Sequence, residues 1–138
     1  MIVRVNGRAY ELMGAASGKI HGLTVAKQVG APQVTPTQSI FKLHADNFVE
    51  FTINFFNPVD INDMKRFSLP VSYVAVKARS LDGKKHQVEV YLDITAEWVI
   101  GDGKANVVWD LHNLANGTST FNIQLKDQHE FQEENELR

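Results

Sequence analysis

Apolar and polar residues alternate with a period of two along most of the chain, which is typical of β-strands that bury one face. Two alternating runs, residues 73–79 and 87–95, flank the pair Asp82-Gly83. Because glycine adopts positive φ without steric cost, an Asp-Gly pair between two such runs predicts a β-hairpin with its turn there. In the second run we expect three residues to face the core: Val90, Leu92 and Ile94.

A second hairpin is predicted from residues 40–43 and 48–56, joined by residues 44–47. One face of its second strand is apolar and rich in phenylalanine, so this face is predicted to be core. The residues of this face are Val49, Phe51, Ile53 and Phe55.

Shorter predicted strands fill most of the remaining chain: residues 2–5, 8–12, 23–29, 105–111 and 120–125, and one around Val34. The pair Asn6-Gly7 predicts a tight turn between the first two. Helical turns are expected only at residues 60–67, with Asp60 or Asn62 as N-cap, and in the tail from residue 127 onward. Strands and turns at this spacing predict an all-β fold, an antiparallel β-sandwich of supersandwich or jelly-roll-like type with at most a short helical turn near residues 60–67.

The composition is that of one globular domain, with 138 residues, 43% hydrophobic residues and 22% charged residues. The apolar runs are too short to span a membrane, and the N-terminus lacks the features of a signal peptide. The net charge of −2 gives no electrostatic footprint for nucleic acid. Acidic residues gather in residues 127–138. We therefore expect a single β-sandwich domain over residues 1–126 and an acidic connector, leading to a downstream domain, over residues 127–138.

Motifs for catalysis and cofactor binding are missing from the sequence. Without cysteine the chain has no disulfide, thiolate metal site or cysteine nucleophile. No two of the five histidines lie within four residues of each other, so surface histidines are favoured over a metal site. No serine lies in a Gly-x-Ser-x-Gly motif, and no glycine-rich phosphate loop follows a strand. We expect no catalytic, cofactor or metal residues in this chain.

Acidic and aromatic residues near the middle of the chain leave alternatives open. Asp93, Glu97 and Asp110 are carboxylates of the kind that glycosidases pair, but a solvent-facing or interdomain surface is the favoured reading. Trp98 and Trp109 form either a platform for stacking sugars or ordinary core, and core is favoured.

One face of the predicted strand near residue 93 has no apolar character and therefore must meet water or another domain. It carries Tyr91, Asp93, Thr95 and Glu97. Surfaces between domains of one chain are fairly polar and favour tyrosine. We expect these four residues to form an interdomain face.

Five segments in series resemble the motifs of one family. They read VTPTQSIF (residues 34–41), VEFTINFFNP (49–58), SLPVSYV (68–74), ARSLDGKKH (78–86) and VEVYLDITAEW (88–98). Together they resemble the N-terminal β domain of the glutaminase A family of fungi and bacteria.

The sequence departs from the family motifs at three positions. Gln38 and Leu69 stand where arginines are usual, and Ala96 replaces a glycine. These departures leave the fold inference intact and put any role carried by those arginines in doubt.

The resemblance implies a parent protein that hydrolyses L-glutamine to glutamate and ammonia and is often exported. This β domain would precede a helical portion similar to an (α/α)₆ toroid and pack on it as a non-catalytic accessory domain. Two other hypotheses remain open. One is a carbohydrate-associated module that uses Trp98, Trp109 and Tyr91. The other is a self-standing enzyme that uses Asp93 and Glu97.

Overall fold

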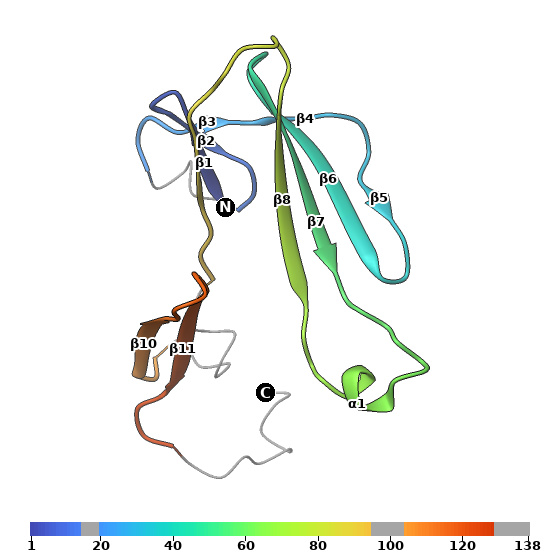
Figure 1. Ribbon diagram of the computed structural model, residues 1–138. Helices are drawn as coiled ribbons and strands as arrows, with labels where there is room; N and C mark the ends of the chain where they lie inside the picture. Colours follow the sequence, from blue (N-terminus) through green and yellow to red (C-terminus); the bar gives the residue numbers. More distant parts are fainter. Residues whose placement is uncertain (15–19, 95–103, 129–138) are drawn as a thin grey trace. The chain divides into compact units, whose positions relative to one another are not determined.

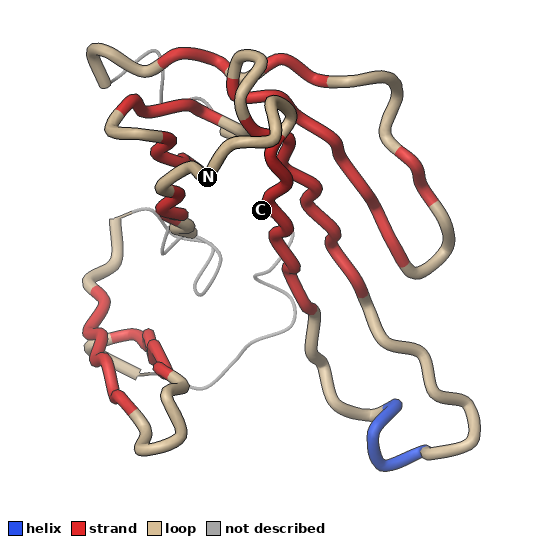
Figure 2. Tube along the Cα trace, turned by 45° about the horizontal axis from the view of Figure 1, so that its top comes forward, coloured by secondary structure: helices blue, strands red, loops and turns tan. Residues whose placement is uncertain are grey.

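The computed structural model describes residues 1–14, 20–94 and 104–128, and strands dominate it (Figures 1 and 2). The predicted all-β class is confirmed: apart from the short parallel pair β2–β3, the strands pair antiparallel, and the one helix among the described residues has four residues. Contacts divide the chain into two units, Met1–Leu92 and Asp93–Arg138, which are described separately. The predicted domain over residues 1–126 and connector over residues 127–138 stay predictions. No helix in the described part of the chain is long and apolar enough to cross a membrane.

The first sheet of unit 1, called sheet A, has the strand order β3-β2-β1-β9. Its strands are β1 (Ile2–Val5), β2 (Arg8–Glu11), β3 (Thr24–Val25) and β9 (Val88–Tyr91). The predicted turn between β1 and β2 is confirmed, since Asn6 and Gly7 have φ values of 49° and 86°. Two successive residues with positive φ are the hallmark of a type I′ hairpin turn.

The second sheet of unit 1, called sheet B, has the order β4-β6-β7-β8, with β5 also paired to β6. Its strands are β4 (Lys27–Gln28), β5 (Gln33–Val34), β6 (Gln38–Ala45), β7 (Val49–Phe56) and β8 (Tyr73–Ser80). The predicted hairpin of β6 and β7 is confirmed, with Ala45 opposite Val49 next to the turn. Both strands have eight residues and are therefore twice as long as those of the β1–β2 hairpin.

The predicted hairpin around Asp82-Gly83 is wrong, because its two strands belong to different sheets. β8 pairs with β7 in sheet B, and β9 pairs with β1 in sheet A. Gly83 does have positive φ, at 73°, so the turn chemistry was correct while the strand pairing was not. Residues 81–87 carry the chain from sheet B to sheet A, as the yellow segment at the top of Figure 1 shows. This segment is called the crossover loop below.

The core of unit 1 is built from both sheets. Its buried members are Met1, Val3, Val5, Tyr10, Leu12, Ala26, Leu43, Ala45, Val49, Phe51 and Ile53. Burial along β7 falls from Phe51 and Ile53, both 0% exposed, to Phe55 at 37%, so the predicted burial of Phe55 is wrong. Strand length explains the difference, because the four-residue β1 of sheet A is about half as long as β7 and cannot cover both ends of it.

The short helix α1 (Met64–Phe67) lies in the long connection between β7 and β8, at the bottom of Figure 1. Its position confirms the predicted helical turn. The predicted cap is wrong, because the N-cap is Asp63, whose carboxylate accepts from the backbone N–H of Arg66 at 3.0 Å. Asp60 instead accepts from the backbone N–H of Asn62, at 3.2 Å.

The described part of unit 2 contains a single hairpin of β10 (Val107–Asn113) and β11 (Ser119–Leu125). Both strands confirm sequence predictions, and in the turn between them Gly117 has φ of 82°. The carboxamide oxygen of Asn116 accepts from the backbone N–H of Thr118 at 3.0 Å, which fixes the turn.

Candidate functional site

The densest polar cluster of unit 1 centres on Asp82 in the crossover loop. A single carboxylate oxygen, Oδ1, accepts from the Ser80 hydroxyl at 3.0 Å and from the Lys84 backbone N–H at 3.0 Å, and lies 2.7 Å from His86 Nε2. These contacts, His86 first, lower the pKa of Asp82 to about 2. Asp82 is therefore a stable anion that holds the loop in shape.

His86 links the crossover loop to the β1–β2 turn. Its Nδ1 lies 2.8 Å from the Asn6 side-chain nitrogen, while the Asn6 side-chain oxygen accepts from the Gln87 backbone N–H at 3.0 Å. Because the amide nitrogen of Asn6 is a donor, Nδ1 accepts and the proton sits on Nε2, where it is donated to Asp82. The His86 side chain is only 7% exposed, so the expectation of surface histidines is wrong here.

The Asp82 cluster holds a serine, a histidine and an aspartate, yet their connections are not those of a nucleophilic triad. In a triad the imidazole accepts the serine proton, and here the Ser80 hydroxyl donates to Asp82 instead. Both ring nitrogens of His86 are already hydrogen-bonded. A hollow of about 170 Å³ lies beside the cluster, lined by Val49, Ala78, Arg79, Ser80, His86 and Val88. The hydrogen bonds of Ser80 and His86 to Asp82 stabilise the crossover loop.

A second polar cluster lies on the outer face of sheet B and was missed by sequence reasoning. The Glu50 carboxylate lies 3.2 Å from His44 Nε2 and accepts from Arg79 Nη2 at 2.9 Å. The hydrogen bond from His44 is the main reason why the pKa of Glu50 is lowered. The three residues are cross-strand neighbours on β6, β7 and β8, so only the register brings them together.

The predicted interdomain face is described only in part. Tyr91 is 57% exposed and lies opposite Ile2 on sheet A, and Asp93 is exposed beyond the end of β9. Thr95 and Glu97 lie outside the described residues, so the face as a whole stays a prediction.

The predicted core positions of the same segment are wrong. All three residues are at least half exposed: Val90 at 50%, Leu92 at 55% and Ile94 at 62%. The ladder explains Leu92 and Ile94, because β1 begins at Ile2, opposite Tyr91, and offers no strand residue beyond that point. The chain after Tyr91 therefore has no pairing partner in sheet A. Val90 is paired with Val3 but lies on β9, an edge strand of sheet A.

The β10–β11 hairpin has an apolar face on which Trp109 stacks against Phe121, with ring centroids 5.4 Å apart. Trp109 is 64% exposed and Phe121 is 58% exposed, so the favoured core position of Trp109 is wrong within unit 2. Trp98, the other residue of the predicted aromatic platform, lies outside the described residues. The aromatic platform therefore stays a prediction.

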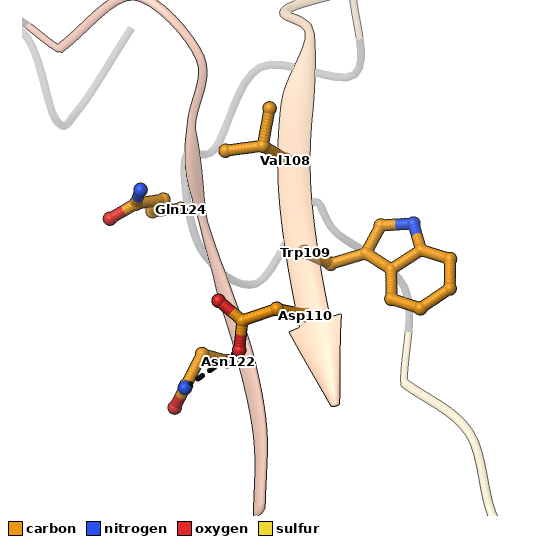
Figure 3. Close-up of a pocket in the computed structure, with 5 residues that line it drawn as sticks. All are labelled: Val108, Trp109, Asp110, Asn122 and Gln124. Carbon is orange, nitrogen blue, oxygen red and sulfur yellow. Dashed lines mark hydrogen bonds between the residues drawn. The ribbon is translucent and has the colours of Figure 1, made fainter. Parts of the chain in front are cut away.

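The opposite face of this hairpin is polar and borders a hollow of about 370 Å³. Figure 3 shows Asp110 directed toward Asn122, and the indole of Trp109 on the other side of the strand. The Asp110 carboxylate accepts from the Asn122 amide at 2.9 Å and lies 3.0 Å from His112 Nε2. The carboxylate is therefore occupied by neighbours on its own hairpin. Across residues 1–14, 20–94 and 104–128, no group of three or more metal-ligating side chains comes together.

Comparison with known proteins identifies the class to which this β domain belongs. Residues 37–138 match the family model described as Domain of unknown function (DUF5127), and the chain belongs to this family. The chain is homologous to glutaminase A of Aspergillus oryzae, with 34% identity over 134 residues, which cover 97% of this chain and 19% of that protein. A probable glutaminase of Arthroderma benhamiae is 31% identical over 70 residues, covering 51% of this chain and 8% of that protein.

The resemblance to the glutaminase A family is thereby confirmed. The chain spans about a fifth of the length of the Aspergillus relative. No solved structure matches the chain.

Proposed function

We propose that this chain is a non-catalytic accessory domain of a glutaminase A-like amidohydrolase, and that it packs on a helical domain of the same polypeptide. The full-length protein would hydrolyse the side-chain amide of L-glutamine: water adds to the amide carbon, the C–N bond breaks, and glutamate and ammonia leave. The observation that carries the proposal is the homology, which spans nearly the whole chain but only 19% of the Aspergillus glutaminase A.

The polar clusters support a structural role for this domain. In the Asp82 cluster every imidazole nitrogen and the serine hydroxyl are bound within the loop and the neighbouring turn. The Glu50 carboxylate is held by His44 and Arg79 on adjacent strands. Amide hydrolysis needs a base or nucleophile free to meet the substrate, and these groups are committed to the fold.

The proposed contact with the helical domain includes the face of Tyr91, Asp93, Thr95 and Glu97. Tyr91 and Asp93 are exposed in this chain and available for such a contact. The test is Asp93→Ala in the full-length protein, with Glu89→Ala on β9, the strand that precedes Asp93, as the control. We expect only Asp93→Ala to lower the melting temperature, with kcat unchanged. If both variants melt like the wild type, this face is a solvent surface and the proposed contact fails.

A carbohydrate-associated module is the second candidate, favoured by the exposed indole of Trp109 stacked on Phe121. Aromatic faces of this kind stack on sugar rings. Titration of the chain with soluble oligosaccharides, monitored by tryptophan fluorescence, distinguishes the candidates. A saturable change that is lost in Trp109→Ala supports the carbohydrate module, and no change supports the accessory domain.

A further inference from the structure

The long connection between β7 and β8, residues 57–72, exposes many large apolar side chains. We call this segment the β7–β8 excursion. Six of its large apolar residues are exposed: Val59 54%, Ile61 76%, Met64 70%, Phe67 49%, Leu69 55% and Val71 43%. The helix α1 within it buries none of its residues. Large apolar side chains gathered at the surface of one short segment are typical of an interaction site.

Hydrogen bonds within the β7–β8 excursion nevertheless fix its local conformation. Asp63 caps α1, and the Ser68 hydroxyl donates to the Lys65 carbonyl at 2.9 Å. At its base the Ser72 hydroxyl donates to the side-chain oxygen of Asn57 at 2.5 Å. A one-turn helix is too short to be stable by itself in water. The excursion is therefore shaped by local hydrogen bonds while its apolar side chains still lack a partner.

The apolar surface continues from the excursion onto the end of sheet B that sheet A leaves uncovered. Phe55 at the end of β7 is 37% exposed, and Val74, its cross-strand partner on the same face of β8, is 41% exposed. Figure 1 shows the excursion extending from this end of β7 and β8. The two regions together form one candidate docking surface within unit 1.

Charge and family extent decide what covers this surface. The charged residues of the excursion balance, with Asp60 and Asp63 against Lys65 and Arg66, so neither an anionic membrane nor nucleic acid is attracted. The excursion lies within the matched family region, residues 37–138, and is thus part of the family's domain. About four fifths of the Aspergillus relative lies outside the region that this chain matches. In the proposed full-length polypeptide, the counterpart of that remainder is a partner held near this surface at high local concentration.

We infer that the β7–β8 excursion docks into an apolar surface of the remaining part of the glutaminase A-like polypeptide, with Ile61, Phe67 and Leu69 as anchors. This inference rests on the proposed function, because it needs the larger polypeptide, but it names a surface separate from the Tyr91 face. The anchors then transfer from water to a protein interior, which ties the accessory domain to the remainder of the protein.

Hydrogen exchange of the full-length protein and of the 138-residue chain provides the first test. We expect backbone amides of residues 57–72 to exchange at least about tenfold more slowly in the full-length protein. The exposed turn at residues 114–118 serves as an internal reference. Equal exchange at residues 57–72, with slower exchange near Asp93, overturns this inference and leaves the proposed packing intact. If no amide of residues 1–94 slows, the proposed packing itself fails.

The second test is Ile61→Asp, matched by Val34→Asp, a residue of sheet B that is 72% exposed. Both side chains are exposed in this chain, so neither variant should change the melting of the 138-residue chain. In the full-length protein, Ile61→Asp is expected to lower the melting temperature and to speed exchange at residues 57–72, whereas Val34→Asp is not. Equal effects of the two variants contradict the inference. A dimer of the 138-residue chain that Ile61→Asp dissociates assigns the surface to a second copy and also overturns it.

Discussion

The imidazole Nε2 of His86 donates to Oδ1 of Asp82 across 2.7 Å, and this contact closes the loop that carries the chain between the two sheets. His86 also meets Asn6 on the β1–β2 turn, and the backbone N–H of Asn6 donates to the Gln87 carbonyl at 3.0 Å. The His86 imidazole thus connects the crossover loop to the β1–β2 turn of sheet A. This connection lies next to the β1–β9 ladder, in which Val5 is opposite Val88.

Replacing Asp82 with asparagine removes the charge that holds the loop, and we expect a lower melting temperature at neutral pH. The pKa of Asp82 is lowered from 3.8 to about 2, so its stabilisation is present above about pH 4 and is lost as the pH falls toward 2. Asp82→Asn should therefore flatten the acid limb of stability against pH. The control is Glu89→Gln, which breaks an exposed ion pair with Arg4 and should change little. An unaltered acid limb in Asp82→Asn would show that this carboxylate does not hold the loop.

Gly83→Val tests the turn at its backbone. Gly83 has φ of 73°, and an added Cβ meets nothing within 4 Å, so the cost is conformational and not steric. A β-branched residue resists positive φ, and we expect a loss of about 1 kcal/mol or more in the free energy of unfolding. Gly83→Asn, which tolerates this conformation, should cost less. Denaturant titration measures both, and an equal effect of the two substitutions speaks against the conformational explanation.

Phe51 and Phe55 lie on the same face of β7 and provide a matched pair for the extent of the core. Phe51 is 0% exposed, and Phe51→Ala should cost about 3–5 kcal/mol. Phe55 is 37% exposed, and in the 138-residue chain Phe55→Ala should cost less than half as much. Equal losses in chemical denaturation would mean that sheet A covers more of sheet B than the exposures indicate.

Tyr10→Phe isolates a single hydrogen bond at the core. The phenol is 1% exposed and donates to Asp46 at 2.7 Å; burial and this bond raise the pKa of Tyr10 above its usual value of 10.0. Removing the hydroxyl should cost about 1 kcal/mol, because Asp46 keeps its ion pair with Arg8. The wild type should also lose stability above pH 10, when the unfolded chain ionises first, and the variant should not. Thermal melts at pH 7 and pH 10.5 measure both effects.

The sequence was sufficient for contacts that are local along the chain. The turn at Asn6-Gly7 and the β6–β7 hairpin follow from alternation and turn residues, and the register then determines the buried face. The strand pairing around Gly83 was not predictable in this way. The turn residue permits a hairpin, but β8 pairs with β7 and β9 pairs with β1 instead of with each other.

Contacts between distant residues account for the other errors. Asn6 and His86 lie 80 residues apart, and the Glu50 cluster needs the pairing of three strands. Alternation indicated an apolar face at Leu92 and Ile94, but the β1–β9 ladder ends at Tyr91 and leaves both residues exposed. The motif ARSLDGKKH contains Asp82 and His86, but the resemblance assigned no contact between them.

The most direct measurement is the release of ammonia from L-glutamine by the folded 138-residue chain, compared with the full-length protein at equal molar concentration. Circular dichroism first establishes that the chain is folded. The accessory role predicts no ammonia above the protein-free blank for the chain and steady turnover for the full-length protein. Turnover by the chain itself would contradict the accessory role, and no turnover by the full-length protein would contradict the glutaminase assignment.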